Sequence, residues 1–321
     1  MNISNNNPHE SPSFVLVGPL RAGTTLLNLM LNNHPQIASV GEFEESVSIL
    51  DDTGWPDLDY YRSWLAQHRV ASSRNYATQP NAATYTDLIS QMWNQLATKY
   101  TKPVIGCTIH SRFDRVRDIW PSTKFIHIIR DPRDVANSCV GMGWVGHPAK
   151  GSVFWTKIVH RWKKIVEHFS AEDYVQIRYE DLLANPQAEL GRCCALLSLE
   201  YHPDMLNFHQ STTYAPLDPT LAEQWRHKMN PRTAEIIDVA CSQWMESYGY
   251  ESSTPDSIPP SLLELFKINV HNRIGRFRFR INRYGVVLTV KWALVKRFSM
   301  DNALRVSANQ KMNEIDTTHL R

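Results

Sequence analysis

The stretch Phe14–Leu27 constrains the fold more than any other part of this sequence. It begins with a short apolar run, Phe14–Val17, which predicts a buried strand. A turn with glycines at positions 18 and 23 follows, and an amphipathic run that begins at Thr24 predicts a helix. Glycine lets the backbone approach a bound group closely, and the first turn of a helix offers unpaired N–H groups at the positive end of its dipole. The stretch therefore predicts a strand–loop–helix cradle for an anion.

Comparison with the nucleotide-binding loop G-x-x-x-x-G-K-[ST] shows one informative departure. Gly18, Gly23 and Thr25 occupy the motif's positions, but Thr24 stands where the lysine belongs. The nearest cation is Arg21, inside the loop. The anion site is thus kept while the point charge that reaches a terminal phosphate is moved. A transferred group with less negative charge than a γ-phosphate, such as a sulfuryl group, tolerates this change.

A second strand, predicted over Lys124–Ile129, leads directly to another candidate phosphate site. Arg130 follows the strand, and Ser138 lies on the helix predicted after it. A guanidinium fork and a hydroxyl together can bind a dianionic phosphate. Asp131 has two interpretations: it caps the helix, or it holds magnesium in a nucleotide kinase. The neighbouring Arg130 and Arg133 make a metal less attractive there.

These two segments carry a family resemblance. The sequence G-x-x-R-A-G-T-T-L-L at 18–27, with the strand and arginine near 130, resembles sulfotransferases that use 3′-phosphoadenosine 5′-phosphosulfate (PAPS). It is most similar to the bacterial branch that shares features with protein-tyrosine sulfotransferases, over residues 14–250. The resemblance implies an α/β fold, with a P-loop-NTPase-like parallel sheet flanked by helices. It also implies metal-independent, in-line transfer of a sulfuryl group to an acceptor hydroxyl or amine, leaving adenosine 3′,5′-bisphosphate.

The same resemblance assigns residues to the donor. It places the 5′-phosphosulfate on the loop and the 3′-phosphate on Arg130 and Ser138, whose spacing matches the family, with Tyr179 near the adenine. The Arg-Lys-Gly phosphate clamp of cytosolic members is not found, and Arg226 or Lys228 are the candidate substitutes. The loop residues assigned in this way are Gly18, Leu20, Arg21, Ala22, Gly23, Thr24 and Thr25.

The base that removes the acceptor proton has three candidates. In tyrosyl sulfotransferases a glutamate soon after the first helix has this role, and Glu42 matches it best, with Glu44 also open. His110 ends a strand predicted over 103–110 and resembles the catalytic histidine of cytosolic members. A carboxylate or a neutral imidazole can accept the proton. Acids also favour the first turn of a helix, so a purely structural role for the acidic cluster remains open.

The C-terminal region differs from the rest in charge. Residues 265–298 contain nine basic residues and no acid, interleaved with aromatic and aliphatic residues. A basic amphipathic segment of this kind suits an anionic membrane surface. Packing within the protein, self-association and recruitment of an anionic acceptor are the alternatives. No other feature indicates a nucleic-acid partner.

Length and composition set the remaining expectations. The 321 residues suit one α/β domain with an appendage: a disordered N-terminus at 1–12, a sulfotransferase domain at 13–254 and a basic helical extension at 255–321. Five cysteines without metal-ligand spacing predict reduced thiols and a cytoplasmic location, and the basic C-terminal segment adds a peripheral position at the membrane as an alternative. No apolar run approaches the roughly 20 residues that span a bilayer.

Two functions compete with sulfuryl transfer. A kinase or nucleotide hydrolase of the same broad fold needs magnesium and usually the loop lysine, so Thr24 argues against it. A membrane-associated binding protein without catalysis is the other.

The aromatic-rich segment 51–102 either lines an acceptor pocket or forms a helical layer on the sheet. The sequence does not identify the acceptor.

Overall fold

The computed structural model describes residues 10–52, 54–68, 71, 74, 76, 82–297, 311–312 and 314–316. Most of the predicted disordered N-terminus lies outside these residues. The chain forms two compact units. Met1–Asp131 and Thr156–Glu223 make the first, and Pro132–Trp155 and Gln224–Arg321 make the second. The functional boundaries expected after residues 12 and 254 stay predictions.

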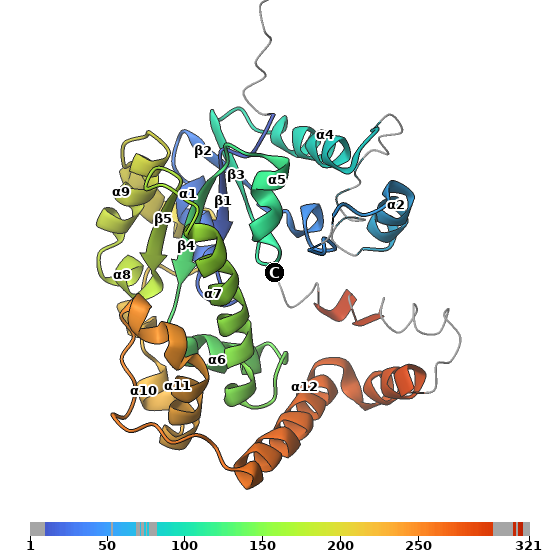
Figure 1. Cartoon of the computed structure of the whole chain (residues 1–321), viewed down its shortest axis with the longest axis vertical. Helices are drawn as coiled ribbons and strands as arrows, with labels where there is room; N and C mark the ends of the chain where they lie inside the picture. The colour runs from blue at the N-terminus through green and yellow to red at the C-terminus, as the bar shows by residue number, and fades with distance from the viewer. Residues whose placement is uncertain are drawn as a thin grey trace, which may run out of the picture. The chain divides into compact units, whose positions relative to one another are not determined.

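The first unit is built on five parallel strands (Figure 1). Their order across the sheet is β2-β3-β1-β4-β5. This confirms the predicted α/β class with a parallel sheet, and the bounds predicted for β1 and β4 are those observed. The strands are β1 (Phe14–Val17), β2 (Ile37–Glu42), β3 (Val104–Thr108), β4 (Lys124–Ile129) and β5 (Tyr174–Arg178).

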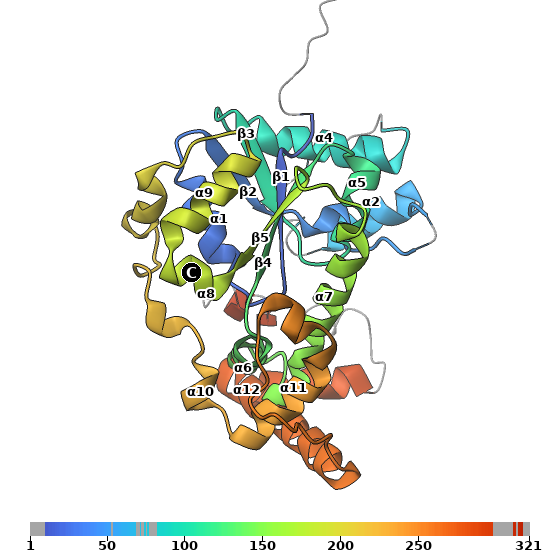
Figure 2. The same ribbon diagram turned by 60° about the vertical axis from the view of Figure 1, so that its left-hand side comes forward.

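Helices cover both faces of this sheet. Figures 1 and 2 show α1, α8 and α9 on one side and α4, α5 and α7 on the other. The helices with residues in this unit are α1 (Thr24–Asn32), α2 (Leu58–Gln67), α4 (Tyr85–Ala97), α5 (Val116–Ile119), α7 (Ser152–Val166), α8 (Tyr179–Ala184) and α9 (Pro186–Leu196). Short 3₁₀ turns connect them: η1 (Glu44–Ser46), η2 (Phe113–Arg115), η4 (Pro203–Gln210) and η5 (Pro219–Leu221).

Alternating side chains of β4 show how the sheet separates two cores. Ile126 and Ile128 point into the apolar cluster shared with α1, α8 and α9. Phe125 and His127 face Trp162 of α7, with ring centroids 6.1 and 4.3 Å away. Because successive strand residues point to opposite faces, one apolar run serves both layers.

The aromatic-rich segment contributes a helical layer where the structure describes it. Trp93 of α4 is fully buried, and its ring centroid lies 6.0 Å from those of both Phe43 and Trp120. Several residues between 53 and 81, which are part of the segment 51–102 expected to line an acceptor pocket, lie outside the described part, and that role stays a prediction.

The second unit is helical. It contains α6 (Pro132–Gly141), η3 (Pro148–Lys150), α10 (Trp225–Lys228), α11 (Pro231–Met245), η6 (Glu246–Tyr248) and α12 (Leu262–Arg297). Its interior holds an ion pair in which Arg133 Nη1 lies 3.2 Å from Asp238 Oδ1. The Arg133 guanidinium also lies 3.6 Å from the ring centroid of Trp225. In α12, Gly285 (φ 78°, ψ 163°) interrupts the helix, which therefore consists of two segments.

All five cysteines are buried thiols, and burial raises the pKa of Cys107 and Cys193. Within the described residues, no helix combines the length and apolar character needed to cross a membrane.

Candidate active site

The predicted site residues gather because parallel strands end at the same edge of a sheet. β1 and β4 are direct neighbours, with Val17 opposite His127, so the loop after β1 and Arg130 after β4 leave the sheet together. Glu42 is the last residue of β2, and Tyr179 directly follows β5. The carboxyl edge of such a sheet is where α/β proteins bind ligands.

The loop between β1 and α1 has the geometry of an anion cradle. Gly18 packs on the neighbouring strand so closely that a Cβ there would lie 2.2 Å from the Ile128 carbonyl oxygen. Gly23 has a φ of 100° and is the N-cap of α1, so no side-chain cap occupies the first N–H groups of the helix. Arg21 also has positive φ (70°), a conformation uncommon outside glycine and concentrated at functional sites. These features confirm the predicted strand–loop–helix corner.

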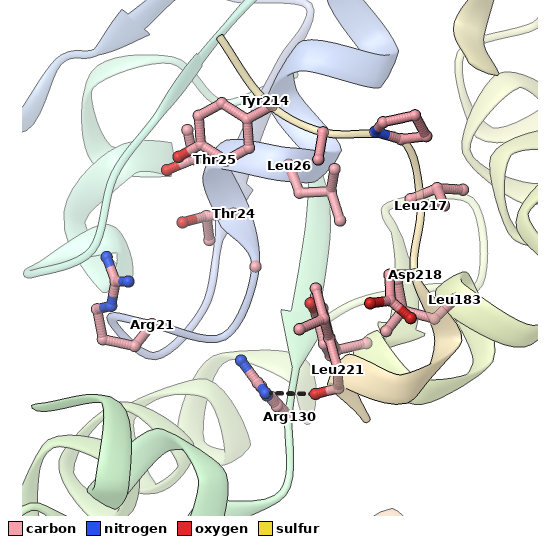
Figure 3. Close-up of a pocket in the computed structure, with 14 residues that line it drawn as sticks. Arg21, Thr24, Thr25, Leu26, Arg130, Leu183, Tyr214, Leu217, Asp218 and Leu221 are labelled. Atoms are coloured by element: carbon pink, nitrogen blue, oxygen red, sulfur yellow. Dashed lines mark hydrogen bonds between the residues drawn. The ribbon is translucent and has the colours of Figure 1, made fainter. Parts of the chain in front are cut away.

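A pocket of about 420 Å³ opens beside this loop (Figure 3). Arg21, Thr24 and Thr25 line it from the loop, and Arg130 and Tyr179 line it from the ends of β4 and β5. The Arg130 guanidinium lies 4.4 Å from the centroid of the Tyr179 ring, a cation–π contact. Two cationic side chains from separate strand ends thus line one pocket.

Arg130 is also fixed by a hydrogen bond to the opposite wall. Its Nη2 donates to the Leu221 carbonyl oxygen at 2.8 Å, as Figure 3 shows. The ring of Tyr179 in turn packs on the loop, because a Cβ added at Gly23 would lie 2.4 Å from its Cδ2. Loop, tyrosine and arginine therefore support one another.

Six of the predicted donor-binding residues line the pocket, and the others lie elsewhere. Gly18, Leu20 and Ala22 belong to the loop without lining the pocket, and Ala22 is fully buried. Ser138 is on α6 in the second unit, so its assigned role stays a prediction, as do those of Arg226 and Lys228. The six are Arg21, Gly23, Thr24, Thr25, Arg130 and Tyr179.

One wall of the pocket was missed from the sequence. It is formed by the segment 214–221, which follows η4 and includes η5, and which contributes five larger side chains together with Ala215. This stretch has no helical or strand periodicity, so no sequence pattern placed it beside the loop. The five side chains are Tyr214, Pro216, Leu217, Asp218 and Leu221.

The two main base candidates lie next to each other. His110 Nε2 is 3.8 Å from Glu42 Oε1, and His110 Nδ1 is 3.1 Å from the Gly18 carbonyl oxygen. A carbonyl oxygen only accepts, so Nδ1 carries the proton of a neutral ring and Nε2 is the acceptor facing Glu42. The His110 side chain is 10% exposed, whereas the Glu42 side chain is 62% exposed. His110 therefore lies between the carbonyl oxygen of Gly18, the first glycine of the loop, and the exposed carboxylate of Glu42.

Glu44 has a different place in the structure. Its two carboxylate oxygens accept hydrogen bonds from the backbone N–H groups of His110 and Ser111, each at 2.7 Å. Both oxygens are therefore engaged in holding the turn after β3. The neighbouring Glu45 is fully buried, where the Tyr76 hydroxyl donates to it and Arg74 Nη1 lies 3.5 Å away.

The remaining charged candidates are engaged in the protein framework. Arg112 pairs with Asp114 at 3.2 Å, and Arg115 pairs with Asp118 at 2.5 Å. Asp131 is buried, and its backbone N–H donates to a Glu180 oxygen at 2.9 Å. In the described part of the chain, no group of three or more His, Cys, Asp or Glu side chains is placed to hold a metal ion.

Comparison with known proteins supplies the class. The model of the sulfotransferase family matches residues 12–203, which is more than half of the chain. A putative protein-tyrosine sulfotransferase from Caenorhabditis briggsae is 25% identical over 201 residues, covering 60% of this chain and 68% of that protein. The chain therefore belongs to the sulfotransferase family.

Solved structures show the same fold. The sulfotransferase domain of the Synechococcus PCC 7002 olefin synthase superimposes with a TM-score of 0.55 at 20% identity, over 75% of this chain and 95% of that one. The sulfotransferase domain from the curacin biosynthetic pathway gives 0.55 at 17% identity, over 75% and 99%. At these identities the likeness concerns the fold, and it agrees with the family assignment.

Proposed function

We propose that this protein transfers a sulfuryl group from PAPS to an acceptor hydroxyl or amine. The observation that carries the proposal is the pocket that joins the loop, with Arg21, to Arg130 on the face of Tyr179. PAPS has two separate anionic groups, a 5′-phosphosulfate and a 3′-phosphate. A pocket with a cationic side chain from each of two strand ends suits such a donor better than a ligand with one phosphate chain.

Donor binding follows from the local chemistry. The backbone N–H groups of the loop and of the first turn of α1 receive the 5′-phosphosulfate, and Thr24 and Thr25 add hydroxyls. The Arg130 guanidinium binds the 3′-phosphate through two N–H donors, with Ser138 as a proposed partner. The buried ring of Tyr179, which lines the pocket, offers an apolar face to the adenosine.

In the transfer step the acceptor oxygen or nitrogen attacks sulfur in line with the departing phosphate. A bond from sulfur to the acceptor forms as the bond from sulfur to the phosphate oxygen breaks. The electron pair leaves with adenosine 3′,5′-bisphosphate, and the acceptor proton passes to the base. Arg21 and the helix N-terminus stabilise the charge that develops on the sulfuryl and leaving oxygens.

The adjacent Glu42 and His110 are the proposed proton acceptors. Glu42 is the more exposed, which suits a group that meets an incoming acceptor. In a neutral His110 ring the unprotonated nitrogen is Nε2, which lies 3.8 Å from Glu42 Oε1. Comparing Glu42→Gln with His110→Gln separates their roles, because removal of a general base costs about 10²- to 10⁴-fold in kcat. The variant with that loss, and with unchanged affinity for the bisphosphate, identifies the base.

The donor class is tested by calorimetry with adenosine 3′,5′-bisphosphate, ADP and magnesium-ATP. We expect the bisphosphate to bind more tightly than ADP or magnesium-ATP. Its binding should persist when a chelator removes divalent metal ions. Arg130→Ala should weaken it by roughly 10- to 100-fold, the effect of losing charged hydrogen bonds, and bring its affinity close to that of ADP. Arg192→Ala is the matched control, since Arg192 is a half-exposed arginine paired with Glu189 and does not line this pocket. Preference for magnesium-ATP would contradict the proposal.

A cytoplasmic location is part of the proposal. Its support is the odd number of cysteines together with the burial of all five as thiols. The test is to isolate the protein from cells under acid quench, unfold it and label its thiols with a thiol-specific reagent. A cytoplasmic protein should have five labelled cysteines.

A further inference from the structure

The first segment of α12, residues 262–284, carries an exposed apolar stripe. Its members recur at intervals of three and four residues, so on a helix they share one sector of about 120°. Their exposed fractions range from 37% to 85%, which is unusual for large aliphatic and aromatic side chains. The stripe consists of Leu262, Leu263, Phe266, Val270, Ile274 and Phe277.

The opposite face of this segment is the one used for packing in the second unit. Ile268 is 6% exposed, and the Asn272 side chain accepts a hydrogen bond from the Gly146 N–H at 2.7 Å. Gly275 meets the same glycine so closely that a Cβ on it would lie 2.5 Å from the Gly146 carbonyl oxygen. Phe279 packs against Gly143 in the same way. The apolar stripe is therefore not the face with which α12 joins its unit.

Basic side chains border the stripe. Lys267 and Arg278 lie along one edge, and Arg273 and Arg276 lie along the other, and all four are exposed. Residues 265–298 contain no acid to neutralise them. The acid that precedes them, Glu264, is turned to another partner, since its Oε1 lies 2.8 Å from Arg232 Nε.

The second segment, 286–297, repeats this arrangement. Val286, Val287, Val290 and Leu294 are exposed and share one face by the same spacing. Thr289 and Val295, on the other side of the segment, are buried. Both halves of α12 thus combine a packed face with an exposed apolar one.

We propose that α12 docks on an anionic phospholipid surface. The stripe enters the boundary between headgroups and acyl chains, and the flanking lysine and arginines contact lipid phosphates. A second copy of the chain fits this face poorly. A two-fold interface pairs a surface with itself, so it would bring the two basic borders together without an acid between them. Charge complementarity therefore favours lipid as the occupant.

The experiment is co-sedimentation of the full chain with vesicles. Phosphatidylcholine vesicles are compared with vesicles that contain about one third phosphatidylserine, at low and high salt. We expect binding to the anionic vesicles that weakens as salt rises, and little binding to the neutral ones. Phe266→Ser with Phe277→Ser should weaken it at least about 10-fold, and Lys267→Gln with Arg278→Gln about 30-fold.

Two control variants match these changes. Ile258→Ser removes an exposed apolar side chain outside α12, and Lys157→Gln with Lys164→Gln removes two exposed charges from α7. Neither should change vesicle binding, and all variants should unfold at the wild-type temperature because the altered side chains are exposed. Absence of vesicle binding, equal binding to neutral vesicles, or binding that the α12 variants leave unchanged would each overturn the proposal. So would dimerisation without vesicles that the α12 variants abolish, which would assign the stripe to a second copy.

Discussion

Replacing Gly23 by alanine tests the loop after β1 and the proposed donor pocket with a single methyl group. Gly23 has a φ of 100°, which an L-residue adopts only at a cost. The added Cβ would also lie 2.4 and 2.8 Å from Cδ2 and Cε2 of Tyr179, distances at which the ring has to move. That ring is 6% exposed and supports the Arg130 guanidinium at 4.4 Å, so its displacement reaches the proposed 3′-phosphate site.

The expected magnitude has two parts. The left-handed backbone costs alanine about 1–2 kcal/mol. Displacing the buried ring costs about 1–3 kcal/mol, as for other overpacked sites. Gly23→Ala should therefore lower the free energy of unfolding by about 2–4 kcal/mol, after about 0.5 kcal/mol is recovered from the stiffer unfolded chain. The affinity for adenosine 3′,5′-bisphosphate should fall by at least about 10-fold, through Tyr179 and Arg130.

Urea unfolding of a double-mutant cycle separates the two parts. In the Tyr179→Ala background the methyl group meets no ring, so Gly23→Ala should cost only the backbone part, and the coupling energy should be about 1–3 kcal/mol. Gly191→Ala is the control, because Gly191 lies inside α9 with open space around it. There the same change should stabilise the protein by about 0.5–1 kcal/mol. Wild-type stability of Gly23→Ala, or a coupling energy near zero, would refute the loop geometry and its packing on Tyr179.

Three further predictions concern single side chains. Glu44→Gln turns an NH₂ group toward a backbone N–H, so urea titrations should show a free energy of unfolding that is lower by about 1–3 kcal/mol. The value of kcat should also fall, because the turn that carries His110 shifts. Unchanged kcat would argue against a positioning role. Arg21→Ala should weaken calorimetric binding of PAPS by about 10-fold and that of the bisphosphate, which lacks sulfuryl oxygens, much less; equal losses would remove Arg21 from the sulfuryl group. Burial lowers the pKa of His127 from 6.5 to about 3, so below pH 6.5 the unfolded chain takes up a proton that the folded chain refuses. Between pH 7 and 5 the wild type should lose about 2 kcal/mol more than His127→Phe, and equal losses in chemical unfolding would show that the buried ring titrates normally.

The wall of the pocket that is formed by the loop and Arg130 was predictable because each of these parts is encoded locally. A strand of four to six apolar residues announces itself, and the residue after it must emerge at the sheet's carboxyl edge. Arg130 was found in this way, as the residue that directly follows β4, whereas Tyr179, which directly follows β5, was assigned by the family resemblance. What the sequence did not contain is that β1 and β4 are neighbours, which brings Arg21 and Arg130 to one pocket.

The opposite wall of the pocket could not be predicted because no local sequence pattern encodes it. The segment 214–221 has no periodic pattern, and its place depends on tertiary contacts such as the hydrogen bond from Arg130 to the Leu221 carbonyl oxygen. The basic character of α12 was clear from composition. The sequence did not show which apolar face of α12 is covered by the rest of its unit. Phe277 and Phe279 are the same residue type two positions apart, but only Phe279 packs on the unit.

The acidic cluster shows how little backbone change separates a catalytic candidate from a structural one. Strand β2 continues to Glu42 after an irregularity between Ser39 and Glu42. That extension pairs Glu42 with Thr108 at the strand ends and leaves its side chain exposed beside His110, while Glu44 turns both oxygens to the backbone. Two carboxylates that are two residues apart thus have different surroundings: that of Glu42 is exposed, and that of Glu44 is bonded to the backbone. Because sequence patterns locate such an irregularity only to within a residue or two, they identify the cluster but cannot choose its base.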